Sequence, residues 1–165
     1  MLKRQTILLL VIVLLLAGCD ALQLLPGDAP GEVVAGESAA VLTVIDGDTI
    51  DVRLNGERVR VRYIGVNTPE RDEPCYEAAT NANAELVEGR TVTLVRDVSE
   101  TDRYGRLLRY VYVGDVFVNE VLVRDGWAEA VVYPPDTRHA TAFRQLEDAA
   151  RSGGLGCHPS GVFGG

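Results

Sequence analysis

The sequence predicts an α+β domain in which five short β-strands close into a barrel flanked by three helices. Two observations predict this fold. Short β-rich apolar segments crowd the early and central parts of the chain, and the helical patterns number three, two of them late. The chain has 165 residues, which is enough for one ordinary domain with its own core. A closed barrel has no open edges, so a short chain of this kind is stable alone.

The first three strands follow one another closely. Val41–Val44 and Ile50–Leu54 are apolar and β-rich, and they flank the turn Asp46–Thr49. Asn55-Gly56 is a strong hairpin signal, which brings the next strand, Arg58–Ile64, back beside the second. This third strand alternates between an apolar face that we expect in the core and a basic face that meets solvent or a ligand. The core face holds Val59, Val61 and Tyr63, and the basic face holds Arg58, Arg60 and Arg62.

A helix and two more strands complete the barrel. Pro74 favours the start of a helix over Cys75–Glu88, which Gly89 ends. Thr91–Arg96 and Arg106–Val113 are the fourth and fifth strands, with a polar loop between them.

The last part of the chain is mainly helical. Val118–Arg124 predicts a short helix, and Ala128–Tyr133 predicts a short extended segment. Asp136 or Thr137 is expected to cap a last helix that runs through Arg151. Its apolar face, spaced for a helix, comprises Ala140, Phe143, Leu146 and Ala150.

The N-terminus has the pattern of an export signal. Lys3 and Arg4 precede the apolar stretch Ile7–Leu16, which is too short to span a bilayer as a helix. The sequence Leu16-Ala17-Gly18-Cys19 resembles a bacterial or archaeal lipobox, in which Cys19 becomes the lipidated N-terminus. An ordinary signal peptide or an uncleaved anchor helix are the alternatives.

The domain boundaries follow from these patterns. We expect a lipoprotein signal peptide at residues 1–18, a flexible tether at 19–38, the barrel domain at 39–157 and a loose tail at 158–165. The apolar Leu22, Leu24 and Leu25 could instead lie on the membrane surface. The predicted location is therefore the extracytoplasmic face of the cell membrane.

The charge balance limits how the protein could hold a polyanion. The formal net charge is −8, and loss of Lys3 and Arg4 with the signal would make it −10. Broad nonspecific binding to nucleic acid needs a basic face. Attraction to a phosphate polymer must therefore come from a metal ion and a local arginine cluster.

With Cys19 assigned to lipid, the remaining cysteines are an even pair, Cys75 and Cys157. A disulfide is the expected state of such a pair in an exported protein. A zinc site is not expected, because these cysteines and the two histidines show no metal-ligand spacing.

The turn Asp46-Gly47-Asp48-Thr49 offers hard oxygen ligands of the kind that Ca²⁺ prefers. A helix-loop-helix calcium loop is excluded, because Ile50 and Asp51 replace its required ligand and glycine, and strands flank the run. Taken alone, the turn is better interpreted as an ordinary β-turn than as a metal site.

Two further runs add a carboxylate and two arginines. Arg62–Glu70 ends the third strand, and Asp102–Arg106 precedes the fifth. Arg62 and Arg106 could hold a phosphate with their planar forks, which lysine could not match. Glu70 could serve as a base, or it could simply favour the start of a helix. Surface salt bridges are the expected role of Arg58, Arg60 and Arg109.

Four runs in this order resemble the staphylococcal (micrococcal) nuclease-like family, the thermonucleases. They are Val44–Thr49, Arg62–Glu70, Asp102–Arg106 and Val118–Arg124, and the resemblance covers about residues 41 to 155. It implies an OB-fold with a five-stranded barrel and three helices. It also implies calcium-dependent hydrolysis of DNA and RNA with little sequence specificity, which leaves 5′-hydroxyl and 3′-phosphate ends.

The resemblance implies a metal site. Asp48 would bind Ca²⁺ directly, and Thr68 would offer its backbone carbonyl. Asp46 would act through a bound water, or it would bind the ion when Asn67 does not. Asn67 stands where the best-studied members have a second aspartate, so the site loses one negative charge. Weaker calcium affinity, or tolerance of another divalent ion, is the expected cost.

The resemblance also assigns the chemistry. Arg62 and Arg106 would grip the phosphate, and Glu70 would take a proton from the attacking water or position it. Tyr104 and Tyr133 could stack on a base or bond its phosphate, or they could be packing residues.

Three hypotheses for function remain. The main one is an exported nuclease, monomeric and anchored to the membrane through Cys19, with DNA and RNA as substrates. The second is an inactive OB-fold lipoprotein that binds nucleic acid or protein. The third is a calcium-binding or structural lipoprotein of the envelope.

Overall fold

The computed structural model describes residues 35–164. The predicted signal peptide, Cys19 and the greater part of the predicted tether lie outside the described residues. Within residues 35–164, no helix is long and apolar enough to cross a membrane.

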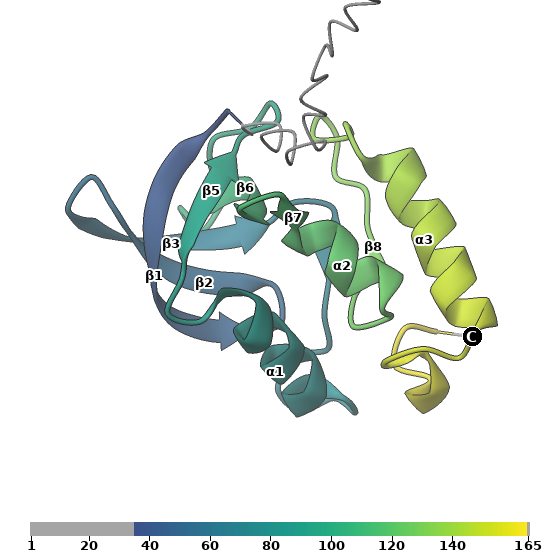
Figure 1. The fold of residues 1–165 in the computed structure, drawn as a ribbon. Coiled ribbons are helices and arrows are strands. Elements are labelled where there is room, and N and C mark those ends of the chain that lie inside the picture. The colour runs from purple at the N-terminus through teal and green to yellow at the C-terminus, as the bar shows by residue number, and fades with distance from the viewer. Residues whose placement is uncertain (1–34, 165) are drawn as a thin grey trace, which may run out of the picture.

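Five strands form a closed barrel (Figure 1). The sheet order is β3-β2-β1-β5-β6, and parallel pairing of β3 with β6 closes it. All other barrel pairs are antiparallel. The predicted five-stranded OB-fold barrel is therefore confirmed. Its strands are β1 (Glu37–Asp46), β2 (Thr49–Leu54), β3 (Glu57–Tyr63), β5 (Thr91–Val95) and β6 (Leu107–Val113).

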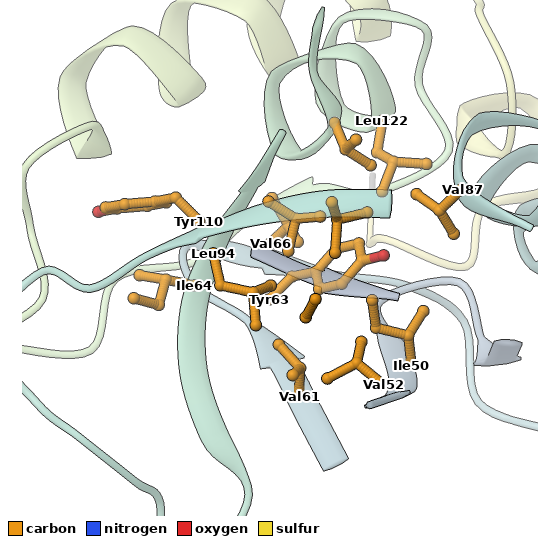
Figure 2. Packing of buried hydrophobic residues seen from close by; sticks show 14 of the residues in the cluster. Ile50, Val52, Val61, Tyr63, Ile64, Val66, Val87, Leu94, Tyr110 and Leu122 are labelled. Atoms are coloured by element: carbon orange, nitrogen blue, oxygen red, sulfur yellow. The ribbon is translucent and has the colours of Figure 1, made fainter. Parts of the chain in front are cut away.

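The core lies inside the barrel and under two helices. On β3, the predicted inward side chains of Val61 and Tyr63 are at most 1% exposed. Figure 2 shows them meeting Ile50 and Val52 of β2, with Leu94 of β5 nearby. Val87 and Leu122 enter the same cluster from helices. Alternation along β3 therefore separates its apolar inner face from the outer face that carries the arginines.

Three helices cover the barrel on one side (Figure 1). They are α1 (Tyr76–Val87), α2 (Val118–Arg124) and α3 (Ala140–Ser152). α1 packs on β1, and α2 lies between the barrel and α3. On α3 the predicted apolar face is buried at Phe143 and Ala150.

Three two-residue strands were not predicted as separate elements. β4 (Val66–Asn67) pairs antiparallel with β8 (Glu129–Ala130), and β7 (Val116–Phe117) pairs with the end of β6. β8 lies within the segment expected to be extended. These strands are too short to give a periodic signal, yet the β4–β8 pair sets the position of Asn67.

The last helix begins later than predicted. It starts at Ala140 after His139, so neither Asp136 nor Thr137 caps it. The Asp136 carboxylate instead accepts hydrogen bonds from the backbone N–H groups of Val98 and Ser99, at 2.9 and 2.8 Å. A long-range contact thus replaces the local cap, and it fastens the start of the loop between β5 and β6.

Arg109 is not a surface residue, so its predicted role in a surface salt bridge is wrong. Its side chain is 2% exposed, and its guanidinium pairs with Glu100 and Glu37. It also donates to the backbone carbonyls of Glu100 and Leu108. Arg109 is therefore a buried link between β6, the loop before it and the start of β1.

The predicted disulfide between Cys75 and Cys157 is present, with 5.6 Å between the Cα atoms. It joins the residue before α1 to the segment after α3. A short 3₁₀ helix, His158–Ser160, follows Cys157. The disulfide therefore ties the C-terminal segment to the chain that leads out of the candidate site.

Candidate active site

The turn between β1 and β2 presents Asp48 at one end of the barrel. Asp46 ends β1 and accepts a hydrogen bond from the Asp48 backbone N–H at 3.1 Å. Gly47 lies directly against Thr68, where an added Cβ would come within 2.7 Å of the threonine side chain. A glycine is therefore required here, because it lets the turn and the segment after β4 come together.

The Asp48 carboxylate is buried at the centre of the site. Its Oδ2 atom accepts the Thr68 backbone N–H at 2.9 Å and lies 3.0 Å from Arg62 Nη2. Its Oδ1 atom accepts the Thr49 hydroxyl at 3.0 Å. Burial raises the pKa of Asp48 to about 6, although the Arg62 charge acts in the opposite direction. A nearby cation stabilises the ionised form of a carboxylate that is this poorly solvated.

Arg62 is held rigidly next to Asp48. Nη1 donates to the carbonyls of Tyr63 and Val66, both at 2.8 Å, and Nη2 donates to Asn67 Oδ1 at 3.2 Å. Its side chain is 15% exposed. These contacts orient the guanidinium before any substrate arrives, which is the arrangement that electrostatic catalysis needs.

Asn67 is held from two sides. Its amide nitrogen Nδ2 donates to Glu129 Oε1 at 3.0 Å across the β4–β8 pair. Its carbonyl oxygen Oδ1 therefore faces Arg62, on the side of Asp48. Glu129 is a site residue that the sequence reasoning missed.

The loop before β6 carries Arg106. The Asp102 carboxylate accepts hydrogen bonds from the Arg106 backbone N–H at 3.0 Å and from Nε at 2.6 Å. It also accepts the Tyr104 backbone N–H at 2.9 Å. Burial raises the pKa of Asp102, but these hydrogen bonds outweigh it and hold the pKa below its usual value. An ionised Asp102 thus closes the turn and orients the arginine.

Arg62 and Arg106 face the same hollow, which has a volume of about 440 Å³. Tyr104 and Tyr133 also line it, and each is 68% exposed. Exposure on this scale contrasts with the fully buried Tyr63 and Tyr110. Both tyrosines are therefore exposed at this hollow, and the guanidinium groups of Arg103 and Arg106 also lie over the Tyr104 ring.

Glu70 lies apart from the lining of this hollow. It is exposed, and its backbone N–H donates to Glu73 Oε2 at 2.7 Å. It follows Thr68 by two residues, and Thr68 is bonded directly to Asp48. Glu70 is thus two residues from the backbone that contacts Asp48, and it is exposed.

The residues around Asp48 fit a weak site for a hard cation. No group of three or more His, Cys, Asp or Glu side chains in residues 35–164 is arranged to hold a metal ion. The available oxygens come from Asp48, the Asn67 amide and backbone carbonyls, which are the ligand types that Ca²⁺ accepts. The buried carboxylate of Asp48 and the neighbouring Asp46 favour positive charge here.

Two more residues that shape the site were not singled out from the sequence. Asn83 of α1 is fully buried and donates to the Asp46 carbonyl at 2.9 Å, while it accepts the Tyr63 hydroxyl. Asp51 of β2 is 3% exposed and binds Arg58 and Arg60. The Asn83 contacts join segments 37 and 20 residues apart, so no local pattern could reveal them. The Asp51 contacts lie within the β2–β3 hairpin, where Asp51 pairs with Arg60.

Comparison with known proteins identifies the family. Residues 60–157 match the family described as staphylococcal nuclease homologue. The chain belongs to this family. The chain is 37% identical over 139 residues to a thermonuclease of Staphylococcus intermedius, a match covering 78% of this chain and 83% of that protein. A thermonuclease of Staphylococcus hyicus is 36% identical over 67% of this chain and 69% of its own length.

A Bacillus subtilis relative, endonuclease YncB, is 44% identical over 66% of this chain but only 55% of its own length. This chain thus spans about half the length of that relative. The family match contains Arg62, Asn67, Glu70 and Arg106 and begins after the turn that bears Asp48.

Proposed function

We propose that this protein is a calcium-dependent nuclease that hydrolyses DNA and RNA with little sequence specificity. The observation that carries the proposal is that the Thr68 backbone nitrogen and Arg62 Nη2 both lie within 3.0 Å of the Asp48 carboxylate. Arg62 also lines the same hollow as Arg106. The thermonuclease and endonuclease names of its relatives support the same chemistry.

The two arginines are assigned to the phosphate. A phosphodiester under attack gains negative charge, and two guanidinium groups that are already oriented stabilise that charge without reorganising. Arg62 is fixed by its carbonyl contacts, and Arg106 is fixed by Asp102. The oxygen of water then bonds to phosphorus as the bond between phosphorus and the 5′ oxygen breaks. The 5′ oxygen takes up a proton from solvent, which leaves a 5′-hydroxyl and a 3′-phosphate.

Glu70 is assigned as the base that accepts a proton from the attacking water or positions it. General-base assistance contributes about 10²- to 10⁴-fold to rate. Its exposed side chain follows Pro69, whose ring restricts the backbone just before it.

Calcium would be held by Asp48, the Asn67 amide oxygen and the Thr68 carbonyl, with Asp46 acting through water. When bound, the ion would supply positive charge against the phosphate oxygens. Because Asn67 carries no charge, we expect weaker calcium affinity than an aspartate without a facing carboxylate would give, or tolerance of another divalent ion.

The test is cleavage of single-stranded DNA and of RNA by the purified protein, with calcium and with EDTA. We expect digestion with calcium that EDTA stops, and we expect Glu70→Gln to lose most of the rate while it keeps its fold. Absence of cleavage with every divalent ion would overturn the proposal. Binding of DNA without cleavage would favour the alternative of an inactive OB-fold binding protein.

We also propose that the protein is exported and anchored through a lipid on Cys19, on the extracytoplasmic face of the membrane. The motif Leu16-Ala17-Gly18-Cys19 carries this proposal. Cys19→Ser should abolish labelling by a radioactive fatty acid and move the protein out of the membrane fraction. Unchanged labelling and fractionation of the variant would contradict it.

A further inference from the structure

A second hollow lies next to the candidate active site. Its volume is about 430 Å³, and its walls are Asp51, Arg58, Arg60, Tyr104, Gly105 and Arg106. Tyr104 and Arg106 also line the hollow that contains Arg62. The two hollows therefore meet at the turn before β6, and a chain bound in one could continue into the other.

The strand pattern places the arginines along this route. Arg58, Arg60 and Arg62 alternate with the inward residues of β3, so they share its outer face. β3 pairs in parallel with β6, with Val61 opposite Leu107. This register places Arg106, just before β6, next to the position of Arg60.

A single buried carboxylate holds both arginines. Asp51 Oδ1 accepts Arg60 Nε at 2.8 Å, and Asp51 Oδ2 accepts Arg58 Nη2 at 2.8 Å. The Asp51 side chain is 4% exposed, whereas those of Arg58 and Arg60 are 61% and 49% exposed. The cluster of Asp51, Arg58 and Arg60 thus has a net charge of +1 and presents two oriented guanidinium groups to solvent.

Charge distinguishes this hollow from others on the molecule. Three arginines face one carboxylate in it, and three arginines face two carboxylates in the hollow of Arg62. A hollow between α1 and α2 includes Glu85 and Asp125, and one beside Cys75 contains one arginine and two glutamates. A polyanion leaving the site would be repelled in those directions and attracted toward Arg58 and Arg60.

We propose that the substrate strand runs from the phosphate site across Tyr104 and Arg106 into this second hollow, where Arg58 and Arg60 bind flanking phosphates. The exposed ring of Tyr104 at the junction suits stacking with an unpaired base. The preferred substrate is then a single strand several nucleotides long. This inference rests on the proposed nuclease function, and it deepens it by naming the substrate and its path.

The test measures binding of fluorescent single-stranded DNA by anisotropy in EDTA, so that cleavage does not interfere, and again with calcium in a Glu70→Gln background. Arg58→Gln/Arg60→Gln should weaken binding of a 12-nucleotide strand about fivefold or more. Loss of two phosphate contacts should lower the slope of log Kd against log salt by about 1.4. Binding of a trinucleotide, which cannot reach the second hollow, should stay within about twofold.

Two control variants test whether a loss of binding depends on the positions of Arg58 and Arg60, on the net charge of the protein or on a folding defect. Arg90→Gln/Arg144→Gln changes the net charge equally at exposed positions elsewhere and should leave binding of the 12-nucleotide strand unchanged. Asp51→Asn/Arg58→Gln/Arg60→Gln removes the carboxylate that would otherwise be left without its partners, and it should show the same binding loss.

The strand path is overturned if the 12-nucleotide strand binds Arg58→Gln/Arg60→Gln like the wild type. It is also overturned if the control pair weakens binding equally, or if the trinucleotide loses as much affinity as the long strand. A wild type that cleaves nothing but binds long DNA through these arginines would leave the path intact and sink the nuclease proposal. The two failures are therefore distinguishable.

Discussion

At the scale of single residues, the two arginines proposed to bind phosphate, Arg62 and Arg106, differ in how they are held. Arg62 donates to two carbonyls and lies 3.0 Å from Asp48, with 15% of its side chain exposed. Arg106 is 30% exposed and relies on the Asp102 carboxylate. The same substitution should therefore have different consequences at the two positions.

Arg62→Lys should lower the free energy of unfolding by about 2 kcal/mol, because an ammonium group cannot make all of these contacts. Arg106→Lys should cost less than about 1 kcal/mol, since its pair with Asp102 is partly solvated. Both should lose activity, because neither lysine can bind phosphate bidentately. Urea unfolding in EDTA measures the two changes in stability, and cleavage rates measure the loss of activity. Equal stability of the two variants would contradict this account.

Asn67 provides a second prediction at this scale, because Glu129 accepts its amide nitrogen at 3.0 Å. Replacing Asn67 with Asp would add a charge to the proposed calcium site, but it would also oppose two carboxylates across the β4–β8 pair. Asn67→Asp alone should therefore improve calcium affinity little. Asn67→Asp/Glu129→Gln should bind calcium at least about tenfold more tightly than Asn67→Asp, since like charges directly opposite are removed.

Isothermal titration of calcium into the four members of this cycle measures the coupling between the two positions. Unfolding in EDTA serves as the structural control. If Asn67→Asp increases calcium affinity by the same factor with and without Glu129→Gln, then Glu129 does not influence calcium binding at position 67.

At the scale of elements, the loop between β5 and β6 depends on a distant anchor. Asp136 accepts the N–H groups of Val98 and Ser99, and these contacts fix the start of the loop that ends in Arg106. Burial raises the pKa of Asp136, but these N–H groups and the Ser99 side chain hold it below its usual value. The anchor is thus complete at neutral pH and weakens as the pH falls through that lowered pKa.

Asp136→Ala should leave the partly buried N–H groups of Val98 and Ser99 without this acceptor and cost about 1 kcal/mol. The amides of Val98 and Ser99 should then exchange with solvent faster, and cleavage should slow because Arg106 is less well positioned. Asp136→Asn keeps a carbonyl acceptor and serves as the matched control. Unchanged exchange at both amides in Asp136→Ala would show that the loop holds itself.

The elements also show what a sequence can and cannot predict. The strands around Ile50 and Val61 were predictable, because alternation and the Asn55-Gly56 turn are local signals. The Asp102–Arg106 turn was predictable for the same reason. The bond between Asn67 and Glu129 spans 62 residues and depends on two strands of two residues each, which leave no periodic trace. The burial of Arg109 likewise depends on Glu37 and Glu100, which the fold alone brings together.

At the scale of the whole molecule, the disulfide closes the domain. Cys75 and Cys157 lie 82 residues apart in sequence, so the bond encloses α1, β5, β6, α2 and α3 in one covalent loop. It also fixes the segment that follows Glu70 and leads into α1. Stability and the position of the candidate base are therefore linked through one bond.

Reduction, or the variant Cys75→Ser/Cys157→Ser, should lower the free energy of unfolding by roughly 4 kcal/mol in the chain-entropy model for a loop of this length. The unfolded chain should also become more expanded, which raises the dependence of that free energy on urea concentration. Urea titrations of the oxidised, reduced and variant proteins in EDTA measure both quantities. The reduced and variant proteins should coincide, because each lacks only this cross-link. A loss below about 1 kcal/mol would mean that the disulfide barely restricts the unfolded chain, and it would contradict the chain-entropy account.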